Sequence, residues 1–308
     1  MRLLVTGATG LLGSDLCRTL QDQYKLVGWA RRIPPAQAGK NRSYLFESMD
    51  ITDRTAVEKG IRAQRPDLVI HTVAMSDVDA CETDPEEALK VNASGVENVA
   101  RACASIGATL MAISTDYVFD GSANRPYQEE DRPNPINAYG RSKLEGEKRA
   151  LGFSEKCLVV RVSGLFGAAR TNFISSAAHR LRAGETVSVV ADQLYSPSYT
   201  ADLAFGIQQL IRQWESDPEG ASPGGRLHGI FHLSNQGGGS RMEVALLIAK
   251  QLGASESLIQ QTSWKGLKRL AQRPVNSRLE CRRFTQLCGS PLRPWGEAVQ
   301  AFLDLEVS

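Results

Sequence analysis

The chain has 308 residues, of which 42% are hydrophobic and 23% are charged, proportions typical of a globular protein with a large buried core. Lysine and arginine number 36 against 34 acidic residues, and the formal net charge of +2 argues against nucleic-acid binding. The N-terminus reads as a strand rather than a signal peptide, and no apolar run is long enough to span a membrane. Six scattered cysteines without zinc spacing predict free thiols, no metal site and a cytoplasmic location.

Short apolar runs alternate with amphipathic segments through the first half of the chain. Strands are predicted at residues 3–7, 24–30, 43–48, 66–74, 108–114 and 157–163, and helices at 11–22, 53–64 and 85–106. Pro85 suits the first turn of its helix, and Asp53 suits the start of the helix before it. Strands that are apolar on both faces and alternate with helices predict a doubly wound parallel sheet of the Rossmann type.

The second half is less regular and predicts a smaller α/β region. A helix is expected over 201–214 and a strand over 229–234, and Ser240 with Glu243 forms the capping box of a further helix. No sharp linker separates the halves. We therefore expect two regions, 1–163 and 164–308, with an approximate boundary and interleaved chains.

Three glycines directly follow the first predicted strand, in the spacing G-x-x-G-x-x-G. Gly7 would permit a tight turn, Gly10 would let the backbone approach a pyrophosphate, and Gly13 would let the helix pack closely on the strand. The free N–H groups at the helix start would then face the anion. This loop predicts a dinucleotide site with contacts from Gly7, Thr9, Gly10, Leu11 and Leu12.

The end of the second strand distinguishes NAD from NADP, because a carboxylate there would bind the ribose 2′-hydroxyl of NAD. This chain has Arg31 and Arg32 instead, whose guanidiniums suit a 2′-phosphate. NADP(H) is therefore predicted, with NAD(H) as the alternative; the competing interpretation is that both arginines only cover a solvated loop. Asp50 and Ile51 would flank the adenine, although Asp50 could equally cap the following helix.

Tyr139 and Lys143 are four residues apart in a predicted helix and would share one face. An ammonium group one turn from a phenol favours the phenolate, so we expect the pKa of Tyr139 to fall from about 10 and the residue to act as an acid or base. Thr115 and Asp116 follow an apolar strand, where α/β sheets place their ligands. Thr115 would bind a substrate oxygen, and Asp116 would contact the substrate or cap the turn.

These residues, together with the runs STDYVFDG (114–121), DQLYSPSYTADLA (192–204) and RPVNSRL (273–279), resemble the dTDP-4-dehydrorhamnose reductase family of the extended short-chain dehydrogenase/reductase superfamily. The resemblance implies an NADP(H)-binding Rossmann domain over 1–163 and a substrate-binding region over 164–308. It also implies NADPH-dependent reduction of the C4 keto group of a nucleotide-linked 6-deoxy sugar, dTDP-4-dehydrorhamnose to dTDP-L-rhamnose. Thr115, Tyr139 and Lys143 would form the catalytic set; Tyr139 would supply the proton and Lys143 would hold the nicotinamide ribose.

Further roles follow from the same resemblance. Thr72, Val73 and Ala74 would pass the cofactor, Asn92 would contact it or support the structure, Asn172 would face the nucleotide sugar, and Arg273 would contact a substrate phosphate. The sequence departs from the family at Gly164, where a tryptophan is usual, which predicts a missing apolar wall beside the sugar. It departs again at His71, which we expect to pack in its strand rather than to catalyse.

Two alternatives stay open at this point. The glycine loop and the RRIPP segment (31–35) also resemble the regulatory β subunit of methionine adenosyltransferase, which binds NADP without catalysing a reaction of its own. Another nucleotide-sugar reductase or an epimerase is the third interpretation, and Arg31 and Arg32 speak against an NAD-retaining epimerase. The expected partners are a nucleotide-sugar substrate and, as an open expectation, a second copy in a homodimer.

Overall fold

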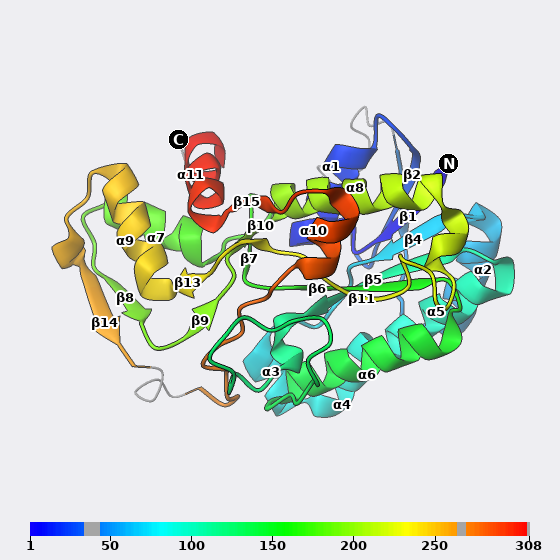
Figure 1. The fold of residues 1–308 in the computed structure, drawn as a ribbon, viewed down its shortest axis with the longest axis horizontal. Helices are drawn as coiled ribbons and strands as arrows, with labels where there is room; N and C mark the ends of the chain where they lie inside the picture. Colours follow the sequence, from blue (N-terminus) through cyan, green and yellow to red (C-terminus); the bar gives the residue numbers. More distant parts are fainter. Residues whose placement is uncertain (34–43, 264–268, 307–308) are drawn as a thin grey trace.

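A computed structural model describes residues 1–33, 44–263 and 269–306, and centres on a seven-stranded parallel sheet (Figure 1). The strand order is β11-β6-β5-β4-β1-β2-β3, and every neighbouring pair is parallel. The strands are β1 (Arg2–Thr6), β2 (Lys25–Ala30), β3 (Leu45–Ser48), β4 (Leu68–His71), β5 (Thr109–Thr115), β6 (Cys157–Val162) and β11 (Gly229–His232). The predicted fold class, a Rossmann-type α/β sheet, is confirmed.

Helices cover both faces of this sheet, which explains why its central strands carry no polar face. One face packs against α1 (Leu11–Leu20), α8 (Thr200–Ser216) and α10 (Arg282–Cys288). The other packs against α2 (Arg54–Gln64), α5 (Gly95–Ile106) and α6 (Ala138–Phe153). Every residue of β5 and β6 is buried, as strands between two helical layers require.

The helix predicted over 85–106 contains a local change of winding. Beyond the short α3 (Val78–Thr83), it begins with α4 (Pro85–Leu89), where Pro85 lies in the first turn, as expected, and Asp84 caps the N-terminus. A π-helical turn over Lys90–Ser94 then joins α4 to α5. Such turns insert an extra residue into a helix and are frequent at functional sites.

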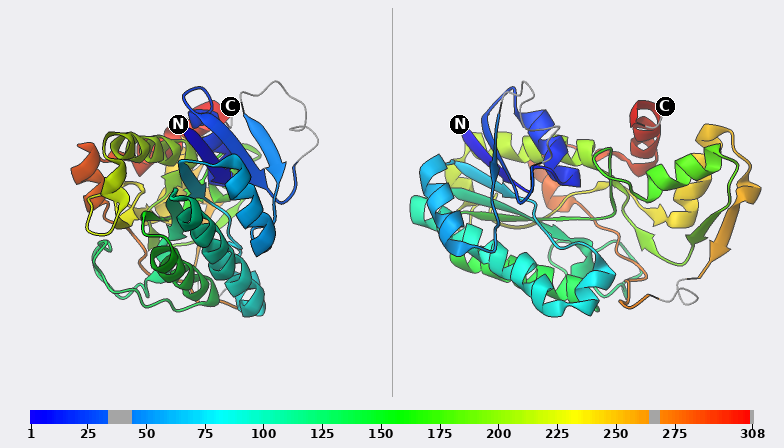
Figure 2. Two further views of the ribbon diagram at one scale, coloured as in Figure 1. Left: turned by 90° about the vertical axis from the view of Figure 1, so that its right-hand side faces the viewer. Right: turned by 180° about the vertical axis from the view of Figure 1, so that it is seen from behind.

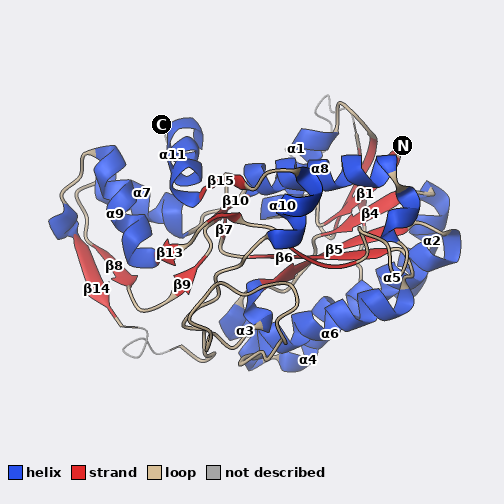
Figure 3. Ribbon diagram, in the orientation of Figure 1, coloured by secondary structure: helices blue, strands red, loops and turns tan. Residues whose placement is uncertain are grey.

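A second, smaller lobe lies beside the sheet (Figures 2 and 3). It contains α7 (Phe173–Arg182), α9 (Arg241–Leu252), α11 (Trp295–Glu306) and the parallel pair β8 (Val187–Val190) and β14 (Ile259–Thr262), around its own apolar core. The predicted capping box at Ser240 and Glu243 is confirmed at the start of α9. The chain does not stay in this lobe, because α8 and β11 return to the central sheet.

In the described part of the chain, three further pairs of short strands lie outside the central sheet. They are β7 (Leu165–Phe166) with β10 (Ser198–Tyr199), β9 (Leu194–Tyr195) with β13 (Gly239–Ser240), and β12 (Asn235–Gln236) with β15 (Leu292–Pro294). Of the predicted strand 43–48, Ser43 lies outside the described residues. All six cysteines are free thiols, and no helix within the described ranges combines the length and apolarity that a bilayer crossing needs.

Candidate active site

The glycine loop joins β1 to α1 and leaves no room for side chains. Gly7 has φ +74°, and a Cβ atom on it would lie 2.5 Å from Thr72 Oγ1. A Cβ atom on Gly13 would lie 2.1 Å from the carbonyl oxygen of Gly7, so the first turn of α1 packs directly on the loop. Gly10 is the N-cap and brings no capping side chain, which leaves the first N–H groups of α1 available to an anion.

This loop opens into a cleft of about 1440 Å³ along the carboxyl ends of the strands, the usual ligand position in such sheets. With the exception of Asn92, the cleft brings together the residues that the sequence predicts to bind cofactor or substrate, from both regions of the chain. They are Gly7, Thr9, Gly10, Leu11, Leu12, Arg31, Arg32, Asp50, Ile51, Thr72, Val73, Ala74, Thr115, Asp116, Tyr139, Lys143, Asn172 and Arg273. Within the described ranges, no cluster of His, Cys, Asp and Glu could hold a metal ion.

Arg31 and Arg32 line the cleft directly after β2, and both are exposed. Asp50, beside Arg31, accepts hydrogen bonds from the backbone N–H and the hydroxyl of Thr52, and these bonds lower the pKa of its carboxyl. The helix-capping alternative for Asp50 is wrong, because Asp53 caps α2 by accepting from Ala56 N at 3.0 Å. Asp50 therefore stays on the cleft wall.

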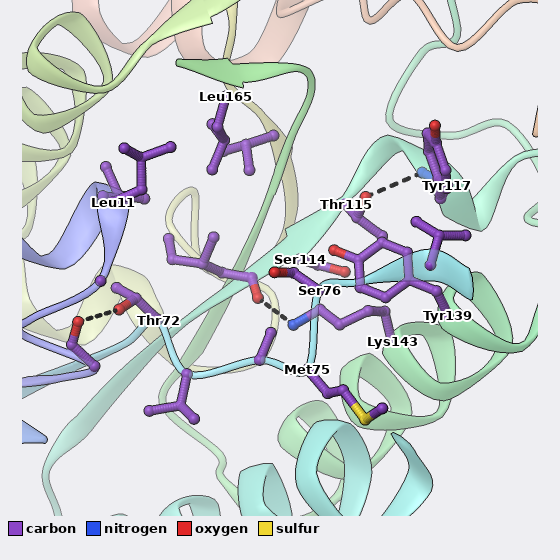
Figure 4. Close-up of a pocket in the computed structure, with 18 of the residues that line it drawn as sticks. Leu11, Thr72, Met75, Ser76, Ser114, Thr115, Tyr117, Tyr139, Lys143 and Leu165 are labelled. Atoms are coloured by element: carbon purple, nitrogen blue, oxygen red, sulfur yellow. Dashed lines mark hydrogen bonds between the residues drawn. The ribbon is translucent and has the colours of Figure 1, made fainter. Parts of the chain in front are cut away.

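Tyr139 and Lys143 lie on α6 one turn apart and face Thr115 at the end of β5 (Figure 4). Asn137 caps α6 by accepting from Gly140 N at 2.8 Å, which sets Tyr139 in the first turn. The ammonium of Lys143 donates to the carbonyl oxygen of Ile113 at 2.7 Å. The three predicted catalytic side chains thus converge, although they come from two elements.

The expected fall in the pKa of Tyr139 is wrong. Burial raises the pKa of its phenol above the usual 10, and a hydrogen bond with Thr115 opposes this rise only in part. Lys143 does not cancel the effect of burial on the pKa of Tyr139. Its own ammonium is buried, and this burial lowers the pKa of Lys143 to about 8. Tyr139 is therefore a neutral phenol at neutral pH, the form that can give a proton.

Asp116 supports Thr115 from behind. Its carboxylate accepts from Thr115 Oγ1 at 3.0 Å and from Ser163 Oγ at 2.7 Å, and the side chain is buried. Burial raises the pKa of Asp116 to about 6, against the lowering effect of these hydrogen bonds. Asp116 thus orients the hydroxyl of Thr115 at the edge of the cleft.

Two residues singled out in the sequence hold the structure together. Asn92, in the π-helical turn, binds the backbone N–H and carbonyl of Met75 and also donates to Ser142 Oγ at 2.9 Å. It thereby ties the loop after β4 to α6. His71 is fully buried and pairs with Thr6 Oγ1 at 2.8 Å, as expected for a packed strand residue.

The residues predicted to contact the substrate already have protein partners. Arg273 forms two 2.7 Å bonds with the carboxylate of Asp79. Asn172 caps α7: its oxygen accepts from Ile174 N and Ser175 N, and its amide donates to two backbone carbonyls. A direct substrate contact would require Asn172 to give up a bond.

Several cleft residues were missed in the sequence. Arg241 and Arg269 line the same end as Arg273. Burial lowers the pKa of Arg269, and the positive charges of Arg273 and Arg241 lower it further. A cluster of guanidiniums in a cleft indicates a site for a polyanion. No local pattern marks these arginines, because they come from a helix start and a loop far apart in the chain.

Comparison with known proteins agrees with this geometry. The family described as RmlD substrate binding domain matches residues 1–307. A dTDP-4-dehydrorhamnose reductase of Streptomyces griseus is 36% identical over 97% of this chain and 91% of that protein. A crystal structure of a dTDP-4-dehydrorhamnose reductase from Clostridium acetobutylicum superposes with a TM-score of 0.84, at 31% identity over the full length of both chains.

One solved relative contains a dinucleotide. The dTDP-4-dehydrorhamnose reductase of Bacillus anthracis in complex with NADP has a TM-score of 0.83 and 31% identity, covering 98% of this chain and 97% of that chain. The match of the family model across the chain and these relatives leave no doubt about descent. The chain belongs to the RmlD family, together with the reductases named here.

Proposed function

We propose that this protein is an NADPH-dependent reductase that converts dTDP-4-dehydrorhamnose into dTDP-L-rhamnose. The observation that carries the proposal is the convergence of Thr115, Tyr139 and Lys143 with the glycine loop in one cleft. Relatives named as reductases of this sugar support the substrate, at 36% identity over 97% of the chain.

The cleft fits NADPH. The loop is compact at Gly7 and Gly10, where a Cβ atom would lie 2.5 Å from Thr72 Oγ1 and 3.0 Å from Gly7 O, and α1 offers its free N–H groups to the pyrophosphate. Arg31 and Arg32 would hold the 2′-phosphate, and NAD(H) is the weaker alternative because no carboxylate follows β2. When bound, NADPH supplies the hydride for the keto carbon.

The catalytic side chains handle the proton that the reduction consumes. Tyr139 donates it from its neutral phenol to the C4 oxygen. Thr115 turns its hydroxyl from Asp116 toward the same oxygen, which positions the carbonyl. The positive charge of Lys143 stabilises the phenolate that remains, and its ammonium also suits the nicotinamide ribose.

The cationic end of the cleft would take the diphosphate of the substrate. Arg241 and Arg269 are better placed for this than Arg273, because Asp79 already neutralises Arg273. Guanidiniums match phosphate oxygens in geometry as well as in charge. In this proposal Arg241 and Arg269 take the place of Arg273 as phosphate ligands. Arg273 instead ties its own loop to α3 through Asp79.

The test is a direct assay. Purified protein is mixed with NADPH and dTDP-4-dehydrorhamnose, and the nicotinamide absorbance is followed while the product is identified. We expect oxidation that depends on the sugar and is slower with NADH. Tight NADPH binding without oxidation, together with binding to a methionine adenosyltransferase, would instead support a regulatory subunit.

The proposal also covers the location of the protein in the cell and its oligomeric state. Six free thiols suit the reducing cytoplasm, which fractionation of the source cells would test. A homodimer is the oligomer we propose, and sedimentation analysis over a concentration series would show a single monomeric species if this is wrong.

A further inference from the structure

The ring of Tyr195 fills the space beside Gly164. Gly164 has φ +54°, and a Cβ atom on it would lie 2.3 Å from Tyr195 Cδ2 and 2.6 Å from Cε2. No side chain could occupy position 164 without displacing this ring. The sequence predicts that Gly164 leaves the sugar site without an apolar wall. In the structure the ring of Tyr195, from another segment of the chain, forms that wall.

Tyr195 lies next to the reaction centre on one side. Gly164 follows Ser163, whose hydroxyl donates to Asp116 behind Thr115. Gly164 and Tyr195 both line the cleft that contains Tyr139. The ring thus borders the place where the reacting sugar would lie.

The other side of Tyr195 faces the cationic end. The guanidinium carbon of Arg241 lies 5.6 Å from the centre of the Tyr195 ring and 4.8 Å from that of Phe173. A nucleotide sugar carries its sugar directly on the diphosphate. A diphosphate bound by Arg241 would therefore place the sugar against Tyr195.

The backbone of this segment is held from several directions. Leu194 N donates to Val275 O at 2.7 Å, and Ser277 N donates to Leu194 O at 2.8 Å. Tyr195 also pairs with Gly239 across the two-stranded β9–β13 sheet. The ring is therefore pre-positioned, which reduces the entropy lost when a ligand packs on it.

Gln193 offers an unused hydrogen-bond donor in the same segment. The residue is 8% exposed and lines the cleft, yet its Nε2 has no hydrogen-bond partner among the described residues. Buried polar groups are normally paired. Because Nε2 itself is buried, the carboxamide of Gln193 would have to turn toward the cleft for this donor to meet a ligand acceptor. A sugar hydroxyl oxygen would satisfy it.

We propose that Gln193 and Tyr195 select the sugar: the ring of Tyr195 packs on its apolar face, and the carboxamide of Gln193 donates to one of its ring hydroxyls. The inference rests on the proposed function, since it assumes a nucleotide-sugar substrate. A buried donor rejects ligands that lack its acceptor far more strongly than an apolar wall does. Gln193 thus sets which hydroxyl must be present, and Tyr195 contributes affinity.

The experiment measures binding of dTDP-L-rhamnose and of dTDP alone to the NADP⁺-loaded protein by calorimetry. We expect Tyr195→Leu and Gln193→Leu each to weaken dTDP-L-rhamnose about tenfold while changing dTDP by less than about twofold. Tyr195→Phe retains the ring and should bind as the wild type does. Tyr24→Leu, a tyrosine outside the cleft, is the matched control.

A second measurement isolates Gln193. The wild type should bind dTDP-L-rhamnose more tightly than at least one of its 2-deoxy and 3-deoxy counterparts, and Gln193→Leu should reduce that ratio about tenfold. An unchanged ratio would overturn the role of Gln193, and an equal loss of dTDP and dTDP-L-rhamnose affinity would overturn that of Tyr195. NADP⁺ affinity reports that each variant is folded.

The same measurements separate this inference from the proposed function. Normal reductase activity with unaltered sugar binding in both variants would refute the inference alone. Sugar-dependent binding losses in a protein that never oxidises NADPH would refute the reductase and leave the sugar site in place. No binding of dTDP-L-rhamnose by the wild type would overturn the inference.

Discussion

Glu147 and Arg161 form a buried ion pair with two hydrogen bonds, of 2.9 Å from Nε and 2.7 Å from Nη2. Both side chains are at most 4% exposed, and Glu147 also accepts from Ser114 Oγ at 2.5 Å. The pair connects α6 to β5 and β6 directly below the active site. Glu147 follows Lys143 by one turn, and its charge opposes the fall in the pKa of that lysine.

Glu147→Gln should destabilise the fold, because it leaves the guanidinium of Arg161 buried without a counter-charge. We expect a loss of about 3–5 kcal/mol in the free energy of unfolding, measured in urea. Glu58→Gln is the control: Glu58 pairs with Arg54 on the exposed surface of α2, and its loss should be hardly detectable. Equal effects of the two substitutions would contradict a structural role of the buried pair.

Tyr139→Phe removes the proposed proton donor and little else. We expect kcat to fall by about 10²–10⁴, the usual contribution of a positioned acid, with NADPH binding retained. The measurement is the rate of NADPH oxidation at saturating sugar. Tyr24→Phe removes the hydroxyl of a tyrosine outside the cleft that bonds to Glu215, and should leave the rate unchanged. Turnover of Tyr139→Phe near that of the wild type would remove this residue from the mechanism.

Arg31→Ala should discriminate between the two nicotinamide cofactors. The lost charge-assisted bonds act only on the 2′-phosphate, so we expect the dissociation constant of NADPH to rise about tenfold or more and that of NADH to change little. Fluorescence titration gives both values. Arg62→Ala, on α2 and outside the cleft, should change neither. Parallel losses for both cofactors would show that Arg31 does not read the phosphate.

Asp116→Asn should change how stability depends on pH. The pKa of Asp116 rises from 3.8 in the unfolded chain to about 6 in the fold, so the native state binds more protons between these values. Its contribution to stability therefore falls as the pH rises from about 4 to about 6. In urea, the free energy of unfolding of Asp116→Asn should rise relative to that of the wild type over this pH range and then stay constant. A difference between the two free energies that does not change with pH would contradict a raised pKa.

Local patterns made much of the fold and of the catalytic set predictable. The glycine spacing and the Tyr139–Lys143 spacing depend on neighbours within one turn, and the structure brings these residues into one cleft as expected. The predicted fall in the pKa of Tyr139 is wrong, because burial raises this pKa and the spacing of Tyr139 and Lys143 carries no information on burial. Gln193, Tyr195 and Arg241 could not be assigned, because tertiary contacts alone bring these residues into the cleft.

The return of β11 to the central sheet has a practical consequence. A fragment that stopped at residue 163 would keep β6 but lose the strand that covers its outer edge. The stretch of β6 that pairs with β11, residues 158–161, would then form an open edge of the sheet, with backbone groups that lack a neighbouring strand. Such an edge recruits other chains, so the fragment 1–163 should aggregate when expressed by itself.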